Sequence, residues 1–319
     1  MTDTSQELIE ALDARVARRN ERREFFKTAL GATAIAAAGA AAIGLAESAG
    51  AASVTDADIF NFALNLEYLE ANFYSFATTG SAISSDSISG TGTLGQATGG
   101  RAVSFTDPVV KAYALEIAQD ELQHVNFLRG VLGSSGVAQP TIDLSPSGAF
   151  TAAAMAAGVI SSGTFDPYAS DENFLLGAFI FEDVGVSAYK GAVAAISTTV
   201  YMQAAAGILA SEAYHASLIR GTLYRKGITT PALRTNADKI SDARDALDGT
   251  SDDDQGISPA TNDYGTASNI TPTDANGICY SRSTGQVLNI VYLNKAMATK
   301  GGFFPNGLNG TINASANNA

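Results

Sequence analysis

The chain is poor in the residues that most often bind cofactors or form covalent cross-links. Among its 319 residues there are one cysteine, Cys279, two histidines and no tryptophan. A single cysteine excludes an intrachain disulfide, and it also excludes zinc sites built on several thiolates and iron–sulfur clusters. We interpret Cys279 as a small buried apolar residue, with a free reactive thiol as the alternative.

Positive charge is also scarce. The chain has 19 Lys and Arg residues against 32 Asp and Glu residues, which gives a formal net charge of −13 at pH 7. Such a chain cannot neutralise a phosphate backbone, so nucleic acid is not expected as a partner. The length allows one large domain or two modest ones. Hydrophobic residues make up 46% of the chain, which is enough to bury a core.

Residues 1–51 have the organisation of an export signal. A charged segment contains the pair Arg22-Arg23, which is followed by Glu, two Phe and Lys, and an Ala- and Gly-rich apolar run then extends from Thr28 to Ala46. Ala49-Gly50-Ala51 is a small-residue cleavage pattern. The paired arginines resemble a twin-arginine signal. We therefore expect export to the periplasm and no membrane attachment after cleavage, with an uncleaved anchor as the alternative.

Apolar side chains at helical spacing predict two pairs of long helices. The first pair begins near Thr55 and at Asp107, and is separated by a Gly-, Ser- and Thr-rich loop over residues 78–106. A crossover over residues 135–170, with a short helix over residues 150–160, leads to the second pair. That pair begins near Ser170 and after a break at residues 198–199, and ends near residue 226.

Both histidines follow a glutamate by three residues. The pairs are Glu121 with His124 and Glu212 with His215. Residues i and i+3 lie on one face of a helix, so each pair presents a carboxylate and an imidazole in the same direction. Two such helices facing each other can hold metal ions. The alternative is a set of core-edge glutamates with two hydrogen-bonded core histidines.

The helix before each Glu-x-x-His motif carries a glutamate within its apolar stripe, and a tyrosine seven residues later. These pairs are Glu67 with Tyr74 and Glu182 with Tyr189. A buried glutamate is costly without a partner. Since seven residues are about two helical turns, we expect each tyrosine to hydrogen-bond the glutamate of its own helix. Glu70, one turn after Glu67, is either solvated at the edge of the stripe or an extra or substitute ligand.

This internal repeat of glutamate and Glu-x-x-His helices resembles the ferritin-like superfamily, whose four-helix bundles bind two metal ions. Within it, the chain is most similar to exported bacterial proteins related to plant desiccation-related proteins. Three stretches carry this likeness, NFALNLEYLEANFY at 61–74, FLLGAFIFEDVGVSAYKGA at 174–192 and GGFFPNGLNG at 301–310. The resemblance implies an all-α bundle of two antiparallel helical pairs over residues 52–227, joined by a long crossover.

The resemblance also implies the roles of the site residues. Glu67 and Glu182 would each bind one metal ion, Glu121 and Glu212 would bridge the two ions, and each histidine would cap one ion. Six ligands are thus expected, namely Glu67, Glu121, His124, Glu182, Glu212 and His215.

Charge and ligand chemistry limit the metals that suit this set. Four carboxylates balance two divalent ions, and carboxylate with imidazole ligation suits iron or manganese. Asp120 precedes the first motif, whereas Ser211 precedes the second. We expect Asp120 to accept the outer N–H of His215 from across the bundle. The matching partner of His124 is then missing or supplied elsewhere.

Residues 228–319 form a polar, loop-rich C-terminal extension that is expected to pack on the bundle. Helices are predicted over residues 236–247 and 287–297, and a loop over 251–273. Within this loop, Asp252–Asp254 reads as a solvated acidic run, with a weak calcium site as the alternative.

The long loop, the crossover and the extension are unsuited to tiling a shell, so a homo-oligomer is possible but a ferritin cage is not expected. The function predicted first is redox chemistry with dioxygen or peroxide in stress or desiccation protection, as a ferroxidase-like or peroxide-consuming oxidoreductase. The alternatives are a metal-binding structural protein of the envelope and metal sequestration without a shell. The sequence does not decide whether the protein is an enzyme.

Overall fold

The computed structural model describes residues 54–319. The predicted export signal at residues 1–51 lies outside the described residues. Within the described part of the chain, no helix is both long and apolar enough to cross a membrane.

The first helical pair is formed by α2 (Asp56–Thr79) and α3 (Pro108–Leu132). The side chain of Thr55 accepts a hydrogen bond from a backbone N–H of the first turn of α2, as an N-cap residue should. The Asp107 carboxylate caps α3 in the same way, and proline stands at the first helical position. Both starts lie where the capping signals in the sequence predict them.

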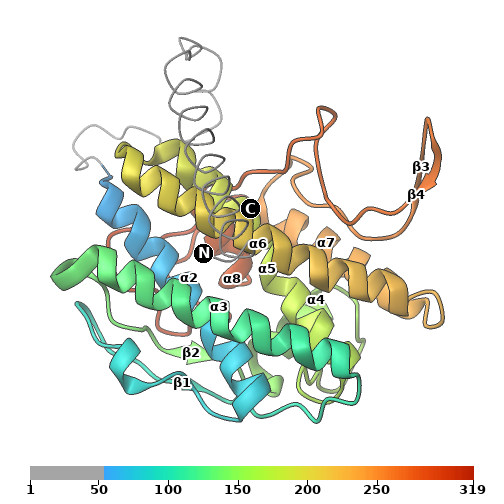
Figure 1. Ribbon diagram of the computed structural model, residues 1–319, viewed down its shortest axis with the longest axis horizontal. Coiled ribbons are helices and arrows are strands. Elements are labelled where there is room, and N and C mark those ends of the chain that lie inside the picture. Colours follow the sequence, from blue (N-terminus) through green and yellow to red (C-terminus); the bar gives the residue numbers. More distant parts are fainter. Residues whose placement is uncertain (1–53) are drawn as a thin grey trace, which may run out of the picture. The chain divides into compact units, whose positions relative to one another are not determined.

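The second pair is formed by α5 (Asp171–Ala195) and α6 (Thr199–Lys226). Ser170 caps α5, and only residues 196–198 connect the two helices, which therefore run antiparallel. Helix α2 packs on α5 and α3 packs on α6, so the pairs close into one bundle (Figure 1). The predicted all-α bundle of two helical pairs is confirmed.

The two long connections support each other outside the bundle. Strand β1 (Ala97–Thr98) of the first connection pairs in parallel with β2 (Ile142–Asp143) of the crossover. The crossover continues through a π-helical turn into α4 (Thr151–Ala156). The short helix predicted here ends earlier than expected, because the chain turns at Gly158, whose φ is 68°. Short 3₁₀ turns complete the connections at Ser85–Ser87 and Gly133–Ser135.

The C-terminal extension adds two helices and a hairpin. Helix α7 (Ala232–Asp248) packs on α5 and α6, and α8 (Thr284–Val291) packs on α5 and α7. Between them, β3 (Ala260–Asn262) and β4 (Gly265–Ala267) form an antiparallel hairpin inside the segment predicted as loop. The extension therefore covers one side of the second helical pair.

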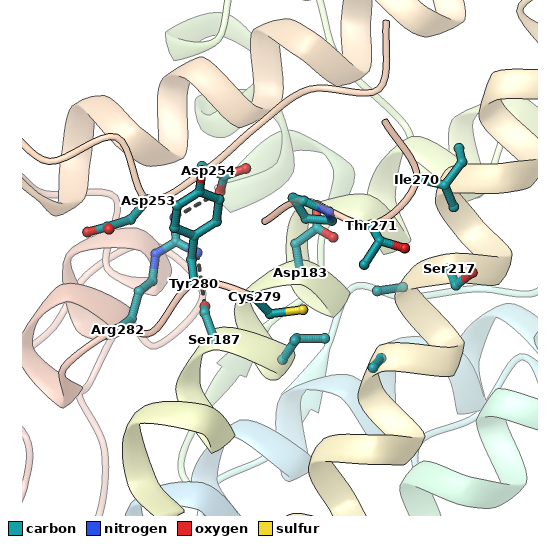
Figure 2. Close-up of a pocket in the computed structure, with 14 residues that line it drawn as sticks. Asp183, Ser187, Ser217, Asp253, Asp254, Ile270, Thr271, Cys279, Tyr280 and Arg282 are labelled. Carbon is teal, nitrogen blue, oxygen red and sulfur yellow. Dashed lines mark hydrogen bonds and ion pairs between the residues drawn. The ribbon is translucent and has the colours of Figure 1, made fainter. Parts of the chain in front are cut away.

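A buried ion network attaches the extension to α5. Arg282 lies 2.8 Å from Asp254 and 2.9 Å from the Ser187 hydroxyl of α5 (Figure 2). Arg244 of α7 contacts the same Asp254 and also Asp183 of α5, each at 2.8 Å. The prediction that the acidic run is solvated is wrong for Asp254, because two buried guanidinium groups provide its counter-charge.

Candidate metal centre

Six buried side chains from the four bundle helices converge in the interior of the bundle. Helices α2 and α5 contribute one glutamate each, and α3 and α6 each contribute a Glu-x-x-His pair, because i and i+3 share a helix face. The most exposed of the six residues retains 9% of its accessible surface. The side chains brought together are those of Glu67, Glu121, His124, Glu182, Glu212 and His215.

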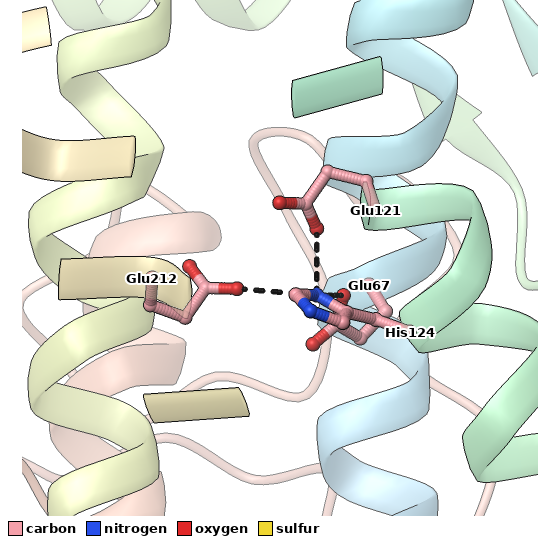
Figure 3. A group of neighbouring side chains, drawn as sticks. All are labelled: Glu67, Glu121, His124 and Glu212. Carbon is pink, nitrogen blue, oxygen red and sulfur yellow. Dashed lines mark ion pairs between the residues drawn. The ribbon is translucent and has the colours of Figure 1, made fainter. Parts of the chain in front are cut away.

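One half of the cluster is centred on His124. Its Nδ1 lies 3.3 Å from Glu67 Oε2, and 3.5 Å from both Glu121 Oε2 and Glu212 Oε1 (Figure 3). The four ligand atoms of this group lie within 4.8 Å of one another. They point toward a common space from three different helices.

The other half is centred on His215. Its Nδ1 lies 2.9 Å from Glu121 Oε1 and 3.6 Å from Glu182 Oε2. With Glu212, these residues form a second group whose ligand atoms also lie within 4.8 Å of one another. Glu121 and Glu212 belong to both groups, so the two halves of the cluster share two carboxylates.

Most of the polar atoms that face the centre of this cluster lack hydrogen-bond partners among the described residues. Eight buried atoms have none, namely Glu67 Oε2, Glu182 Oε2, Nδ1 of His124 and His215, and both carboxylate oxygens of Glu121 and Glu212. A buried polar atom without a partner costs about 1–3 kcal/mol. Carboxylate oxygens and imidazole nitrogens are ligands for divalent ions. The donor set therefore fits metal ions, and this fit offers a physical reason for so many otherwise unsatisfied atoms.

Protons take the place of metal charge when no cation is bound. Burial raises the pKa of Glu67 to about 8 and that of Glu182 well above its usual value, because a charged carboxylate is disfavoured away from water. Burial alone would lower the pKa of His215, but the nearby carboxylates of Glu121, Glu182 and Glu212 raise it to about 11. A metal ion that bound here would therefore have to displace protons from this cluster.

Each of the two tyrosines hydrogen-bonds the cluster glutamate of the other helical pair. Tyr74 of α2 donates its hydroxyl proton to Glu182 of α5, and Tyr189 of α5 donates to Glu67 of α2. The prediction that each tyrosine bonds the glutamate of its own helix is wrong. Seven residues separate the two positions by about 10.5 Å along the helix axis, whereas the neighbouring helix brings the other glutamate within reach.

Asp120 lies where the sequence predicts it. Its Oδ2 is 3.2 Å from the outer nitrogen, Nε2, of His215 across the bundle. Such a contact fixes the tautomer and orientation of a ligating imidazole. The repeat has Ser211 at the matching position, and within residues 54–319 no carboxylate pairs with the outer nitrogen of His124.

Two arginine contacts of the repeat were not predicted from the sequence. Arg129 of α3 lies 2.8 Å from the Tyr68 hydroxyl of α2, and Arg220 of α6 lies 2.8 Å from Asp183 of α5. Tyr68 and Asp183 each follow a cluster glutamate, so the two contacts are equivalent. The equal spacing of the arginines in the repeat was the available signal, but it does not identify their partners.

Glu70 lies outside both groups of ligand atoms. Its carboxyl is buried, and burial together with the charge of Glu212 raises its pKa well above the usual value. The equivalent residue of the second half is Gly185. A Cβ atom there would lie 2.2 Å from Glu212 Oε2 and 3.5 Å from Glu70 Oε1. Glu70 therefore approaches the cluster from beside Glu212 without joining the ligand atoms.

Comparisons with known proteins agree with this geometry. A family model of the ferritin-like domain matches residues 55–225, the span of the four bundle helices. The chain belongs to the ferritin-like domain family. This ferritin-like protein is 28% identical over 266 residues to the ferritin-like catalase Nec2 of Nesocodon mauritianus, an alignment that covers 81% of this chain and 84% of the relative. It is 30% identical over 248 residues to the desiccation-related protein PCC13-62 of Craterostigma plantagineum, covering 73% of this chain and 76% of the relative.

Proposed function

We propose that this ferritin-like protein holds two divalent ions, iron or manganese, and uses them to consume peroxide. Glu67 and Glu182 would each bind one ion together with the nearest histidine, and Glu121 and Glu212 would bridge the two. The single observation that carries the proposal is that the two groups of ligand atoms share two carboxylates. Four carboxylates also balance the charge of two divalent ions.

Peroxide is the preferred substrate because one relative is named a ferritin-like catalase. In peroxide disproportionation, one molecule gains two electrons and two protons to give two waters, and a second loses two of each to give dioxygen. A pair of iron or manganese ions, when bound, can exchange those two electrons with an O–O bond. Dioxygen, as used by a ferroxidase, is the other oxidant compatible with the same pair of ions.

The residues of the chain orient the ligands and keep bulk water out. Tyr74 donates a hydrogen bond to Glu182, and Tyr189 donates one to Glu67. Each bond holds the glutamate of the opposite helical pair in place. Burial raises the pKa of both phenols well above 10, so they stay protonated donors. Asp120 holds the ring of His215. The cluster is therefore preorganised on rigid helices.

Metal analysis and peroxide assays test this proposal. Protein purified from its own compartment should contain about two ions per chain and release dioxygen from peroxide. Glu121→Gln should lose metal and turnover, whereas the control Glu116→Gln, at an exposed position of the same helix, should retain both. Purified wild-type protein without bound metal would refute the dinuclear proposal.

A second candidate is a metal-binding structural protein of the dehydrated cell envelope, without turnover. The specific support is the desiccation-related relative, at 30% identity. A metal-loaded protein that is inert to both peroxide and ferrous iron, but whose metal-free form unfolds on drying, would favour this candidate. We propose no ferritin-type shell in either case, because the connections and the C-terminal extension enlarge each chain well beyond the four helices.

We further propose that the protein is exported by the twin-arginine route, which carries folded proteins. The support is the pattern at Arg22-Arg23 and the apolar run after it. Replacement of both arginines by lysine should leave the precursor in the cytoplasm. An unchanged periplasmic yield of the doubly substituted protein would exclude this route.

A further inference from the structure

An internal cavity lies beside the carboxylate cluster, between α2, α5, α8 and the segment around Phe303. It is small, with a volume of about 20 Å³, and the residues around it are buried. Its walls are formed by Leu66, Leu69, Glu70, Ile180, Phe181, Val184, Gly185, Ile290, Val291 and Phe303. The C-terminal extension supplies the outer wall through α8, so the cavity exists only because this extension packs on the bundle.

Glu70 is the only ionisable residue of the cavity wall. It retains 5% of its accessible surface, and its carboxyl makes no side-chain hydrogen bond or ion pair with other residues in the described range 54–319. The other lining residues are apolar or glycine. A lone buried carboxyl among apolar side chains is costly unless something occupies the space with it.

The cavity adjoins the cluster at Glu70 and Gly185, where the two halves of the internal repeat differ. Glu70 and Gly185 occupy equivalent positions of the two helical pairs, because each follows the cluster glutamate of its helix, Glu67 or Glu182, by three residues. Oxygens of Glu70 and Glu212 both lie within 3.5 Å of the point where a Cβ of residue 185 would stand. The absent side chain thus lets the Glu212 carboxylate pack against Gly185, a residue of the cavity wall.

We propose that this cavity binds hydrogen peroxide, with an O–H of the substrate hydrogen-bonded to Glu70 and its O–O unit beside Glu212. Apolar walls and nearby carboxylates disfavour anions and hydrated ions. A small neutral molecule with O–H groups satisfies the Glu70 carboxyl and fits the remaining space. The assignment of peroxide rests on the proposed function, whereas the cavity and its preference for a small neutral guest do not.

Xenon tests the cavity without any turnover, because apolar cavities in proteins bind xenon. Crystals of the wild-type protein under xenon pressure should show a xenon atom beside Val291, and Val291→Phe should exclude it. The matched control is Ala243→Leu, which fills a separate apolar cavity between α4, α7 and α8. Xenon beside Val291 should persist in this control. An empty wild-type cavity, or equal occupancy in Val291→Phe, would overturn the proposal.

Kinetics of the metal-loaded protein test Glu70 as a positioning residue. Glu70→Leu should raise the KM for peroxide about tenfold, the effect of one lost hydrogen bond of about 1.4 kcal/mol, with a smaller change in kcat and an unchanged metal content. Glu70→Gln, which keeps a hydrogen-bonding amide, should restore most of the KM. Val291→Phe should raise the KM as well.

The outcomes separate the two proposals. Loss of metal in Glu70→Leu would make Glu70 a ligand and overturn its role in the cavity, and so would an unchanged KM in both Glu70→Leu and Val291→Phe. A metal-loaded wild-type protein that does not consume peroxide would refute the proposed function and the assignment of peroxide. The xenon experiment would then still decide whether the cavity admits a small neutral guest.

Discussion

Gly185 should be essential for metal binding although it binds nothing itself. A Cβ atom at this position would lie 2.2 Å from Glu212 Oε2, whereas ordinary contacts begin at 3.4 Å. In Gly185→Ala the carboxylate of Glu212 must therefore move by about 1.2 Å, the difference between these distances. It is the far end of a flexible side chain, so the helix can remain intact while the carboxylate moves.

The size of this shift predicts a selective loss of metal. Metal–ligand distances tolerate deviations of roughly 0.2 Å, so a bridging carboxylate displaced by 1.2 Å cannot contact both ions. We expect the affinity for metal to fall at least as far as for lost supporting contacts, roughly 10- to 100-fold. Metal-free Gly185→Ala should keep its stability or gain up to about 1 kcal/mol, because alanine is the better helix former.

Gly207→Ala on α6 is the matched control, because a Cβ atom there meets nothing within 4 Å. Metal content by mass spectrometry and thermal unfolding with and without chelator should be measured for both variants. The control should bind two ions and unfold at the same or a higher temperature, whereas Gly185→Ala should lose the stabilisation that metal provides. Wild-type metal affinity in Gly185→Ala would refute the proposed position of the bridging carboxylate.

Four further predictions follow from the contacts of the cluster and of the extension. Tyr189→Phe removes the hydrogen bond to Glu67 and should destabilise the protein by about 1–3 kcal/mol in denaturant unfolding; an unchanged midpoint would contradict this contact. Asp120→Asn should lower metal affinity roughly 10- to 100-fold by releasing the ring of His215, and equal affinity in competition with a chelator would count against it. Because the Glu67 carboxyl has a pKa of about 8 without metal, metal binding must release its proton, and the affinity for metal should fall as the pH is lowered from 8 to 6. Calorimetry in buffers of different ionisation enthalpy should detect this proton release, and its absence would disprove the coupling between metal binding and deprotonation of Glu67. Arg282→Met leaves buried Asp248 without its counter-charge and leaves Asp254 with Arg244 alone. It should cost about 3–5 kcal/mol, which would be ruled out by an unfolding midpoint equal to that of the wild type.

The helices were predictable because their signals are local. Thr55 and Asp107 cap α2 and α3, and both helices begin where those side chains satisfy backbone N–H groups. The Glu-x-x-His spacing likewise places each carboxylate and imidazole on one helix face. The convergence of all six side chains was accessible through the likeness to a known architecture, since spacing within one helix does not reveal which helix lies opposite.

The tyrosines and the acidic run could not be assigned locally. The partner of Tyr74 lies 108 residues away in sequence, on the opposite helical pair. Asp254 looks solvated within its acidic run, yet Arg244 and Arg282 bury it because α7 and the segment before α8 fold onto α5. In both cases the interaction depends on packing between segments that are distant in the chain.

The sequence by itself determined the elements and the chemistry of this protein, because helix caps, apolar spacing and the doubled Glu-x-x-His motif act over a few residues. The sequence also determined which side-chain atoms are available to bind metal ions, and that the four carboxylates balance the charge of two divalent ions. The tertiary structure alone decided that each tyrosine hydrogen-bonds the glutamate of the other helical pair. It also decided that Glu70 lies beside the cluster, close to Gly185, its counterpart in the repeat. The cavity beside the cluster depends on side chains from α2, α5 and α8, and it forms only when these helices pack together.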